Sequence, residues 1–154
     1  MTTPDHPVPP AAGQRHWHFG SAPVEQVAHR GWVVGHFIEP DDIRHSTDVE
    51  IKWGIHRAGE RRAAWQQTEH RTAVTILLSG RFRVDFDGGG CTLEHPGDYA
   101  MWGPGVGHSW RAEEHSTVIT IRWPSTAPPV PGRLEARGAA WWPSQTSPGE
   151  EQSG

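Results

Sequence analysis

The sequence predicts an all-β fold, because its central part is a series of short extended segments separated by turn residues. The clearest segment is 81–86, where Phe82, Val84 and Phe86 alternate with charged residues, so that one face is buried and one is wet. No window shows a convincing helical period. We expect strands at 32–38, 48–56, 72–79, 81–86, 91–95, 98–102, 108–112 and 116–123.

Glycines and apolar runs define how these segments are joined and covered. The run Asp87-Gly88-Gly89-Gly90 turns the chain between two strands, because glycine supplies the positive φ of a tight reversal. Segments 72–79 and 118–123 are apolar on both alternating faces. This indicates that the outer face of one sheet is covered as well, most simply by a second copy in a homodimer.

The chain of 154 residues has room for one domain with two tails. We expect a flexible segment at 1–15, the folded domain at 16–125, and a Pro/Ser/Gly-rich tail at 126–154. Trp141 and Trp142 could dock this tail on the domain or on a partner subunit, and a mobile tail is the alternative.

Charge and composition exclude several classes of protein. Fourteen basic and eighteen acidic residues give a net charge of -4, the wrong sign for binding nucleic acid or an anionic membrane. No segment approaches the roughly 20 apolar residues of a membrane span, and the start of the chain does not read as a secretory signal. Cys91 is the single cysteine, so no internal disulfide forms and a cytoplasmic location is expected.

The tract 97–108 carries the most specific signal. It reads GDYAMWGPGVGH, and it resembles the second motif of the cupin superfamily, G-x5-P-x-G-x2-H, with Gly103 at the usual proline. The resemblance implies a small single-domain cupin, a jelly-roll β-barrel and a homodimer. It also implies that His108 begins a strand and points into the barrel as a metal ligand, with Trp110 on the same face.

The first cupin motif, G-x5-H-x-H-x3,4-E-x6-G, is degraded in this sequence. When the motif is counted back from Gly80, which stands at its last glycine, Ala73 falls at the glutamate position. Gln67 and Glu69 stand at the two histidine positions, or Gln66 and Thr68 with the longer spacing. Three of the four family ligands are therefore not the expected residues.

The remaining metal candidates are Gln67, Glu69 and His108, which could hold iron, zinc, manganese or nickel. Glutamine is a weak neutral ligand, so a metal-free site is favoured. His16 and His18 form a second histidine pair at i and i+2, but they precede the barrel and are expected in a solvated segment.

Without a metal, His108 can act as an acid or base, since imidazole titrates near neutral pH. Glu69 is its expected acidic companion, because burial beside tryptophan would raise the pKa of that carboxyl. The alternative is that His108 only caps the turn and that Glu69 is a loop residue.

Nine tryptophans exceed what a core of this size needs, which predicts a flat-walled pocket for an apolar or aromatic small molecule. Its expected lining is Trp53, Trp65, Trp102, Trp110 and Gln67. His56 is expected to be a satisfied or surface histidine. Arg71 and Arg122 are candidates for binding an anion, but a position on the outer face is favoured for each.

Two classes of function fit these residues. The first is a small-molecule enzyme that uses His108, with or without Glu69, for acid-base or metal-assisted isomerase, cyclase or lyase chemistry. The second is a non-catalytic binding or sensing barrel, and a metal-dependent dioxygenase is a further alternative. Convergence of Gln67, Glu69 and His108 would favour the enzyme, whereas His108 alone among aromatic rings would favour the binder.

Overall fold

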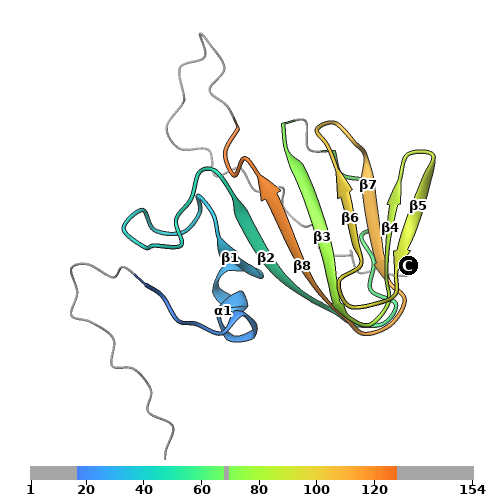
Figure 1. Cartoon of the computed structure of the whole chain (residues 1–154), viewed down its shortest axis with the longest axis horizontal. Helices are drawn as coiled ribbons and strands as arrows, with labels where there is room; N and C mark the ends of the chain where they lie inside the picture. Colours follow the sequence, from blue (N-terminus) through green and yellow to red (C-terminus); the bar gives the residue numbers. More distant parts are fainter. Residues whose placement is uncertain (1–16, 68–69, 128–154) are drawn as a thin grey trace, which may run out of the picture.

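The computed structural model describes residues 17–67 and 70–127. The elements in this part of the chain (Figure 1) are α1 Ala22–His29, β1 Trp32–Val34, β2 Glu50–His56, β3 Thr72–Ser79, β4 Phe82–Phe86, β5 Gly89–Leu93, β6 Tyr99–Trp102, β7 His108–Ala112 and β8 Ser116–Trp123. Every pair of neighbouring strands is antiparallel. The predicted all-β fold is confirmed.

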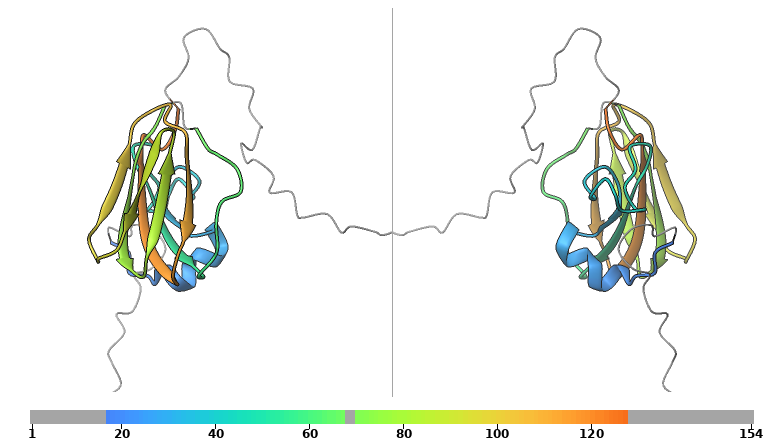
Figure 2. Two further views of the ribbon diagram at one scale, coloured as in Figure 1. Left: turned by 90° about the vertical axis from the view of Figure 1, so that its right-hand side faces the viewer. Right: turned by 90° about the vertical axis from the view of Figure 1, so that its left-hand side faces the viewer.

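The strands form two sheets that lie face to face (Figure 2). The larger sheet has the order β1-β2-β8-β3-β6 and the smaller has the order β5-β4-β7. The last strand, β8, lies between β2 and β3, so strands far apart in sequence are neighbours in the sheet, as in a jelly roll. This is the predicted barrel architecture.

Strand β1 is shorter than the expected segment 32–38. It ends at Val34, and the backbone of Gly35 is already engaged in a loop. The Gly35 N–H donates to the Arg44 carbonyl at 3.1 Å, and the Gly35 carbonyl accepts from Ile38 at 3.2 Å and from Ser46 at 3.3 Å. These bonds replace the ladder bonds that a longer strand would need.

The β4–β5 hairpin is tighter than the glycine run suggests. Only Asp87 and Gly88 form the turn, with φ of 86° at Gly88, and Phe86 already pairs with Gly89. A two-residue turn of this kind matches the right-handed twist of the two strands, so the following glycines join β5 instead of the turn.

Helix α1 is not expected from the sequence. The Ser21 carbonyl accepts the first bonds, from Val24 at 3.0 Å and Glu25 at 2.9 Å. Arg30 and Gly31 end the helix with φ of 51° and 92°. Its eight residues make about two turns, too few for a helical period to stand out. No helix in the described ranges is long and apolar enough to cross a membrane.

The hydrophobic core lies between the sheets and uses alternate residues of the facing strands, as the pleat requires. The core residues are Ala73, Leu77, Phe82, Val84, Leu93, Ala100, Trp102, Ala112 and Val118. Gly105, with φ of 79°, lets the chain turn from β6 into β7, so His108 begins β7 as predicted.

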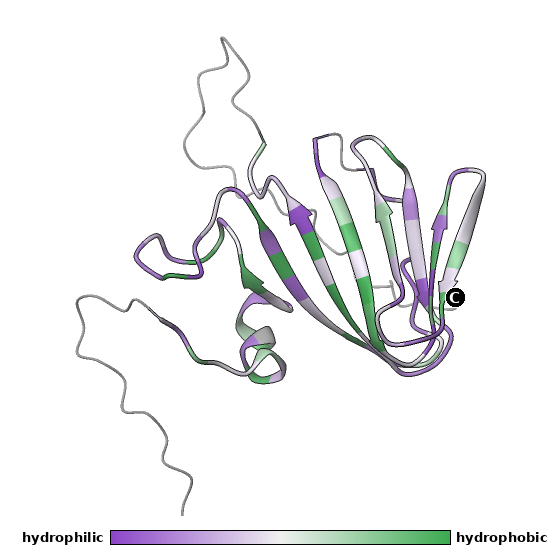
Figure 3. Ribbon diagram, viewed as in Figure 1, coloured by the Kyte–Doolittle hydropathy of each residue, from purple (hydrophilic) through white to green (hydrophobic). Residues whose placement is uncertain are grey.

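The larger sheet has an inverted polarity at β2. Lys52 and His56 face inward, whereas the outward positions on the same strand are Ile51, Trp53 and Ile55. The alternation is visible as purple and green bands along β2 in Figure 3. A sheet with one wet face normally turns its apolar row inward. Here the interior next to β2 is polar and the outer face is apolar.

Candidate functional site

A cavity lies between the two sheets and takes its wall from inward-facing residues of both. The strands contribute most of the lining, and the segment between β2 and β3 closes one side. The lining residues are Trp32, Lys52, Gly54, His56, Arg62, Gln66, Thr75, Phe82, Val84, Trp102, His108, Trp110, Val118, Thr120 and Arg122. The cavity therefore combines aromatic rings with two imidazoles and three cationic side chains.

His108 is held firmly at the start of β7. Its backbone exchanges two hydrogen bonds of 2.9 Å with Gln66, and its ring packs on Trp102 with centroids 4.6 Å apart. Nδ1 lies 3.3 Å from the Val106 carbonyl, which can only accept, so Nδ1 carries the proton and Nε2 is the basic nitrogen.

Burial lowers the pKa of His108, and the positive charges of Arg62 and Arg122 act in the same direction, against the hydrogen bond to Val106. The ring is therefore neutral at physiological pH. A neutral imidazole with a defined tautomer can accept a proton from a bound molecule and return it elsewhere.

His56 is the second imidazole of the cavity. Its Nδ1 lies 3.4 Å from Glu60 Oε1, and its ring packs on Trp110 at 4.3 Å. Burial lowers the pKa of His56, although Glu60 raises it. A Cβ at Gly54 would lie 2.8 Å from His56 Nε2, so this ring nitrogen sits directly over a wall position that has no side chain.

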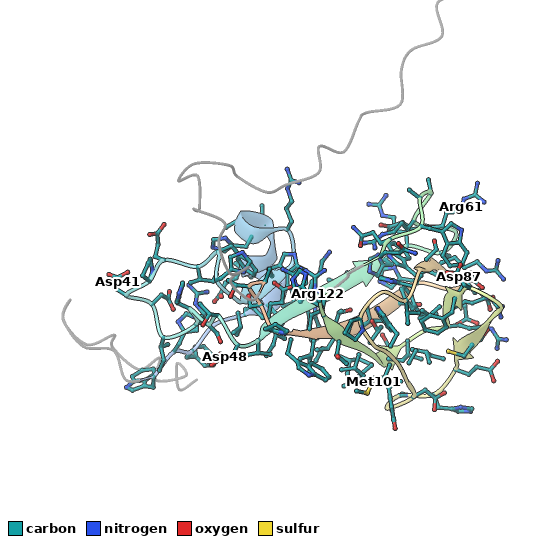
Figure 4. The ribbon with its side chains drawn as sticks, turned by 90° about the horizontal axis from the view of Figure 1, so that it is seen from above. Asp41, Asp48, Arg61, Asp87, Met101 and Arg122 are labelled. Atoms are coloured by element: carbon teal, nitrogen blue, oxygen red, sulfur yellow. The ribbon has the colours of Figure 1, made fainter. Side chains whose placement is uncertain are left out.

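Three cationic side chains reach the cavity: Lys52 from β2, Arg62 from the connecting segment and Arg122 from β8. Figure 4 shows Arg122 on the side of the barrel nearer α1, away from Arg61 and Asp87. Sequence analysis places Arg122 on the outer face, and the structure corrects this. Arg122 is an even-numbered residue of β8, on the inward row with Val118 and Thr120.

Arg71 is also inside, not on the outer face as expected. It is 8% exposed and lies 3.4 Å from Glu50, a carboxylate that is 1% exposed and also pairs with Arg122. A buried charge is stable only when it is paired, so Glu50 holds these two arginines in the interior. Burial lowers the pKa of Arg122 to about 10, while Glu50 raises it and Arg71 lowers it further.

The structure brings three of the predicted site residues together, because His108, Trp102 and Trp110 line the same cavity. Trp53 is on the opposite row of β2, paired with Ile119 on the outer side. Trp65 is 54% exposed and is not part of the wall. Trp32 supplies the further ring that the sequence analysis did not select.

Gln67 is exposed, and its neighbour Gln66 lines the cavity instead. The Gln66 side chain accepts a hydrogen bond from the Arg62 guanidinium. Glu69 lies outside the described residues, as do His16 and the tail with Trp141 and Trp142. His18 is described, and it pairs with Glu25 of α1 at 3.3 Å.

Lys52, Arg62 and His56 are the cavity residues that sequence reasoning missed. The signal was present in β2, whose residues alternate between a polar row and a wholly apolar row. A half-buried strand usually turns its polar row to water, so the pattern alone does not suggest a polar cavity wall. The apolar outer row of the neighbouring strand β8, taken together with β2, would have indicated that the polar row of β2 faces inward.

Comparisons with known proteins found similar solved structures only. No family model and no curated protein matches the chain. Three similar solved structures are KdgF from Halomonas sp. (25% identical, covering 52% of this chain and 73% of that one, TM-score 0.48), a cupin superfamily protein from Desulfitobacterium hafniense (20%, covering 51% and 69%, TM-score 0.46), and a conserved protein with a double-stranded β-helix domain from Klebsiella pneumoniae (20%, covering 54% and 73%, TM-score 0.49). The jelly-roll arrangement of the chain is shown by its own strand order.

The resemblance of the tract 97–108 to the second cupin motif raises the expectation of a divalent metal, but the described lining does not fit one. Its imidazoles are those of His56 and His108, and no carboxylate or thiol is among the lining residues. Within residues 17–67 and 70–127, no group of three or more His, Cys, Asp or Glu is placed to hold a metal. Three cationic side chains in the same space would also repel a divalent cation. The described wall therefore offers no donor set for the dioxygenase hypothesis.

Proposed function

We propose that this protein is a small-molecule enzyme in which His108 transfers a proton to or from a ligand bound in the aromatic cavity. The observation that carries the proposal is the state of His108, a neutral imidazole in the cavity wall whose tautomer is set by Val106. The reaction class is isomerisation, cyclisation, dehydration or elimination, each of which needs a proton moved between two atoms of one substrate.

The surroundings of His108 support both halves of such a transfer. Nε2 accepts the proton, and the ring of Trp102 beside the imidazole stabilises the cation that forms. Its lowered pKa then favours release of the proton to a second position on the ligand. Glu69 stays a proposed acidic companion, and His56 is the second titratable group in the described wall.

Deuterium exchange tests this proposal without a known substrate. The protein is incubated in D2O with a panel of 2-oxo acids, aryl ketones and 3-oxo esters, and loss of the α-hydrogen signal is followed by proton NMR. We expect exchange for at least one compound, and a loss of roughly 100-fold or more in His108→Gln, the range for removal of a general base.

The matched control is His115→Gln, which changes an exposed histidine in the turn between β7 and β8. This variant should catalyse hydrogen exchange of the test compound as fast as the unsubstituted protein does. Exchange that survives His108→Gln, or that is lost equally in both variants, contradicts the role of His108.

A non-catalytic binding or sensing barrel is the second candidate. It is favoured by the residues near His108, since Gln67 is exposed and the described lining contains no carboxylate. A pocket that binds the panel compounds and quenches tryptophan fluorescence, yet exchanges no hydrogen, would support this function over the enzyme.

We also propose that a second copy of the chain covers the outer face of the larger sheet. Neighbouring outward residues form continuous apolar rows across β2, β8, β3 and β6. One row is Trp53, Ile119, Ile76 and Tyr99, and the next is Ile51, Ile121, Val74 and Met101. Met101 lies on this outer side in Figure 4 and is 55% exposed. An apolar patch of this width is typical of an interface.

A further inference from the structure

The cavity carries a surplus of positive charge around Trp32. The guanidinium carbon of Arg122 lies 4.1 Å from the centre of the Trp32 ring, and Lys52 Nζ lies 5.5 Å from it. Lys52 is opposite Thr120, and Arg122 follows two residues later on β8, so the two cations are diagonal neighbours on one face of the sheet. Like charges in this arrangement repel each other, which lowers the stability of this part of the barrel.

The acids near this cluster offset it only in part. Glu50 is in register with Arg122 on the same face of the sheet, and its single negative charge is shared between Arg122 and Arg71. Glu60 is on the surface, where it accepts the Arg57 N–H at 3.0 Å and pairs with His56. Among the described residues, no carboxylate lies within ion-pair distance of Lys52 or Arg62.

Buried polar atoms around the cavity also lack hydrogen-bond partners. Among the described residues these include the donors Arg122 Nε and Trp102 Nε1 and one acceptor, Glu50 Oε1, which forms ion pairs with Arg71 and Arg122. Burial, together with Arg62 and Arg122, lowers the pKa of Lys52. Buried donors without acceptors cost free energy, so the site is complete only when a ligand brings acceptor atoms and negative charge.

The strand register places this cluster across the cavity from His108. Arg122 is in register with Ala73, which is in register with Trp102, and the Trp102 ring packs on His108. One layer of the barrel thus runs from Arg122 to His108. The next layer holds Lys52, Thr120 and Thr75, whose two threonine hydroxyls are 3.0 Å apart.

We propose that the ligand of this cavity carries a carboxylate, held by Lys52, Arg62 and Arg122, on a flat unsaturated body that reaches across to His108. Guanidinium and ammonium groups supply the charge-assisted donors that a carboxylate accepts. A planar carboxylate also continues a flat body between Trp32 and Trp102, which a tetrahedral phosphate does not. The position of the reacting carbon at His108 rests on the proposed function, whereas the anion site does not.

Paired ligands test the charge requirement directly. Benzoate, trans-cinnamate and phenylpyruvate are each compared with the corresponding neutral amide by titration calorimetry and tryptophan fluorescence. We expect at least one acid to bind about 10-fold more tightly than its amide, the scale of one charge-assisted hydrogen bond. No preference for any acid over its amide overturns the proposal, and so does tighter binding of phenyl phosphate than of every carboxylate.

Two variants locate the anion. Lys52→Met keeps the length of the side chain and removes its charge, and it should weaken binding of the preferred acid about 10-fold while changing binding of its amide less than about 2-fold. Arg61→Gln is the control. Arg61 is exposed and is not in the cavity wall, unlike its neighbour Arg62, so removing its charge should not change the affinity for the acid or for its amide. Equal weakening of acid and amide by Lys52→Met, with near-ultraviolet circular dichroism unchanged, overturns the assignment.

The same protein separates this inference from the proposed function. His108→Gln should retain the preference for the acid, because the anion site does not include His108. If carboxylates bind but no compound exchanges hydrogen, the enzyme proposal fails and the anion site stands. If a neutral ketone exchanges through His108 and no acid is preferred, the anion site fails alone.

Discussion

At the scale of single residues, the fold lowers the pKa of three histidines, and two of these, His56 and His108, line the cavity. His36, His56 and His108 all have a lowered pKa, with burial as the main cause in each case. The folded chain therefore binds fewer protons than the unfolded chain just below the usual histidine pKa of 6.5. This stabilisation is complete above 6.5 and is lost as the pH falls through that value toward the folded-state pKa.

We predict that the free energy of unfolding is smaller at about pH 5.5 than at about pH 7.5, and that His108→Gln reduces this difference. Urea unfolding at the two pH values measures both quantities. Asp42 does not titrate between these two pH values, since the Arg44 hydrogen bond lowers the pKa of its carboxyl to about 2. An unchanged pH dependence in His108→Gln would show that this imidazole is not held neutral by the fold.

At the scale of elements, β2 forms part of the cavity through a glycine. A Cβ at Gly54 would lie 2.8 Å from His56 Nε2 and 3.0 Å from Val118 Cγ2. We predict that Gly54→Ala destabilises the fold by about 1–3 kcal/mol, as overpacking does, and weakens ligand binding by displacing His56. Thermal unfolding and tryptophan fluorescence titration measure the two effects.

Gly103→Ala is the matched control, because a Cβ there meets nothing within 4 Å. It should leave binding unchanged and alter stability by no more than about 1 kcal/mol, in the stabilising direction. Gly54→Ala with unchanged binding would mean that His56 does not shape the pocket.

The elements were predictable from sequence to the extent that local rules form them. Alternation and turn glycines locate β7 and β8 at their observed residues, 108–112 and 116–123. The cavity was less predictable, because an alternating strand has two faces and the pattern alone does not say which one points inward. For this reason Lys52 was missed and Arg122 was assigned to the outer face, since the decision lies in the pairing of β2 with β8. His108 was found because the tract 97–108 resembles the second cupin motif.

At the scale of the whole molecule, β2 and β8 have to satisfy two requirements at once. Their inner rows carry Lys52, His56 and Arg122, and their outer rows carry the apolar side chains that we assign to a dimer interface. An interface on the outer face of β2 and β8 would restrict the motion of the strands that form the cavity wall. A rigid wall reduces the entropy lost on binding a ligand, so dimerisation and ligand affinity should rise and fall together.

Sedimentation velocity measures this coupling. We predict a dimer for the unsubstituted chain and a monomer for Ile119→Lys, since a charge in the centre of an apolar interface costs several kcal/mol unless it is paired. Ile43→Lys changes a loop residue that is 52% exposed, so it should leave the dimer intact. The monomeric variant should also bind the preferred carboxylate more weakly than the Ile43→Lys control. A monomeric unsubstituted chain, or a dimer that tolerates Ile119→Lys, would contradict the proposed dimer interface. The apolar rows would then have to be covered by something other than a second copy, because a wide apolar sheet face is unfavourable in water.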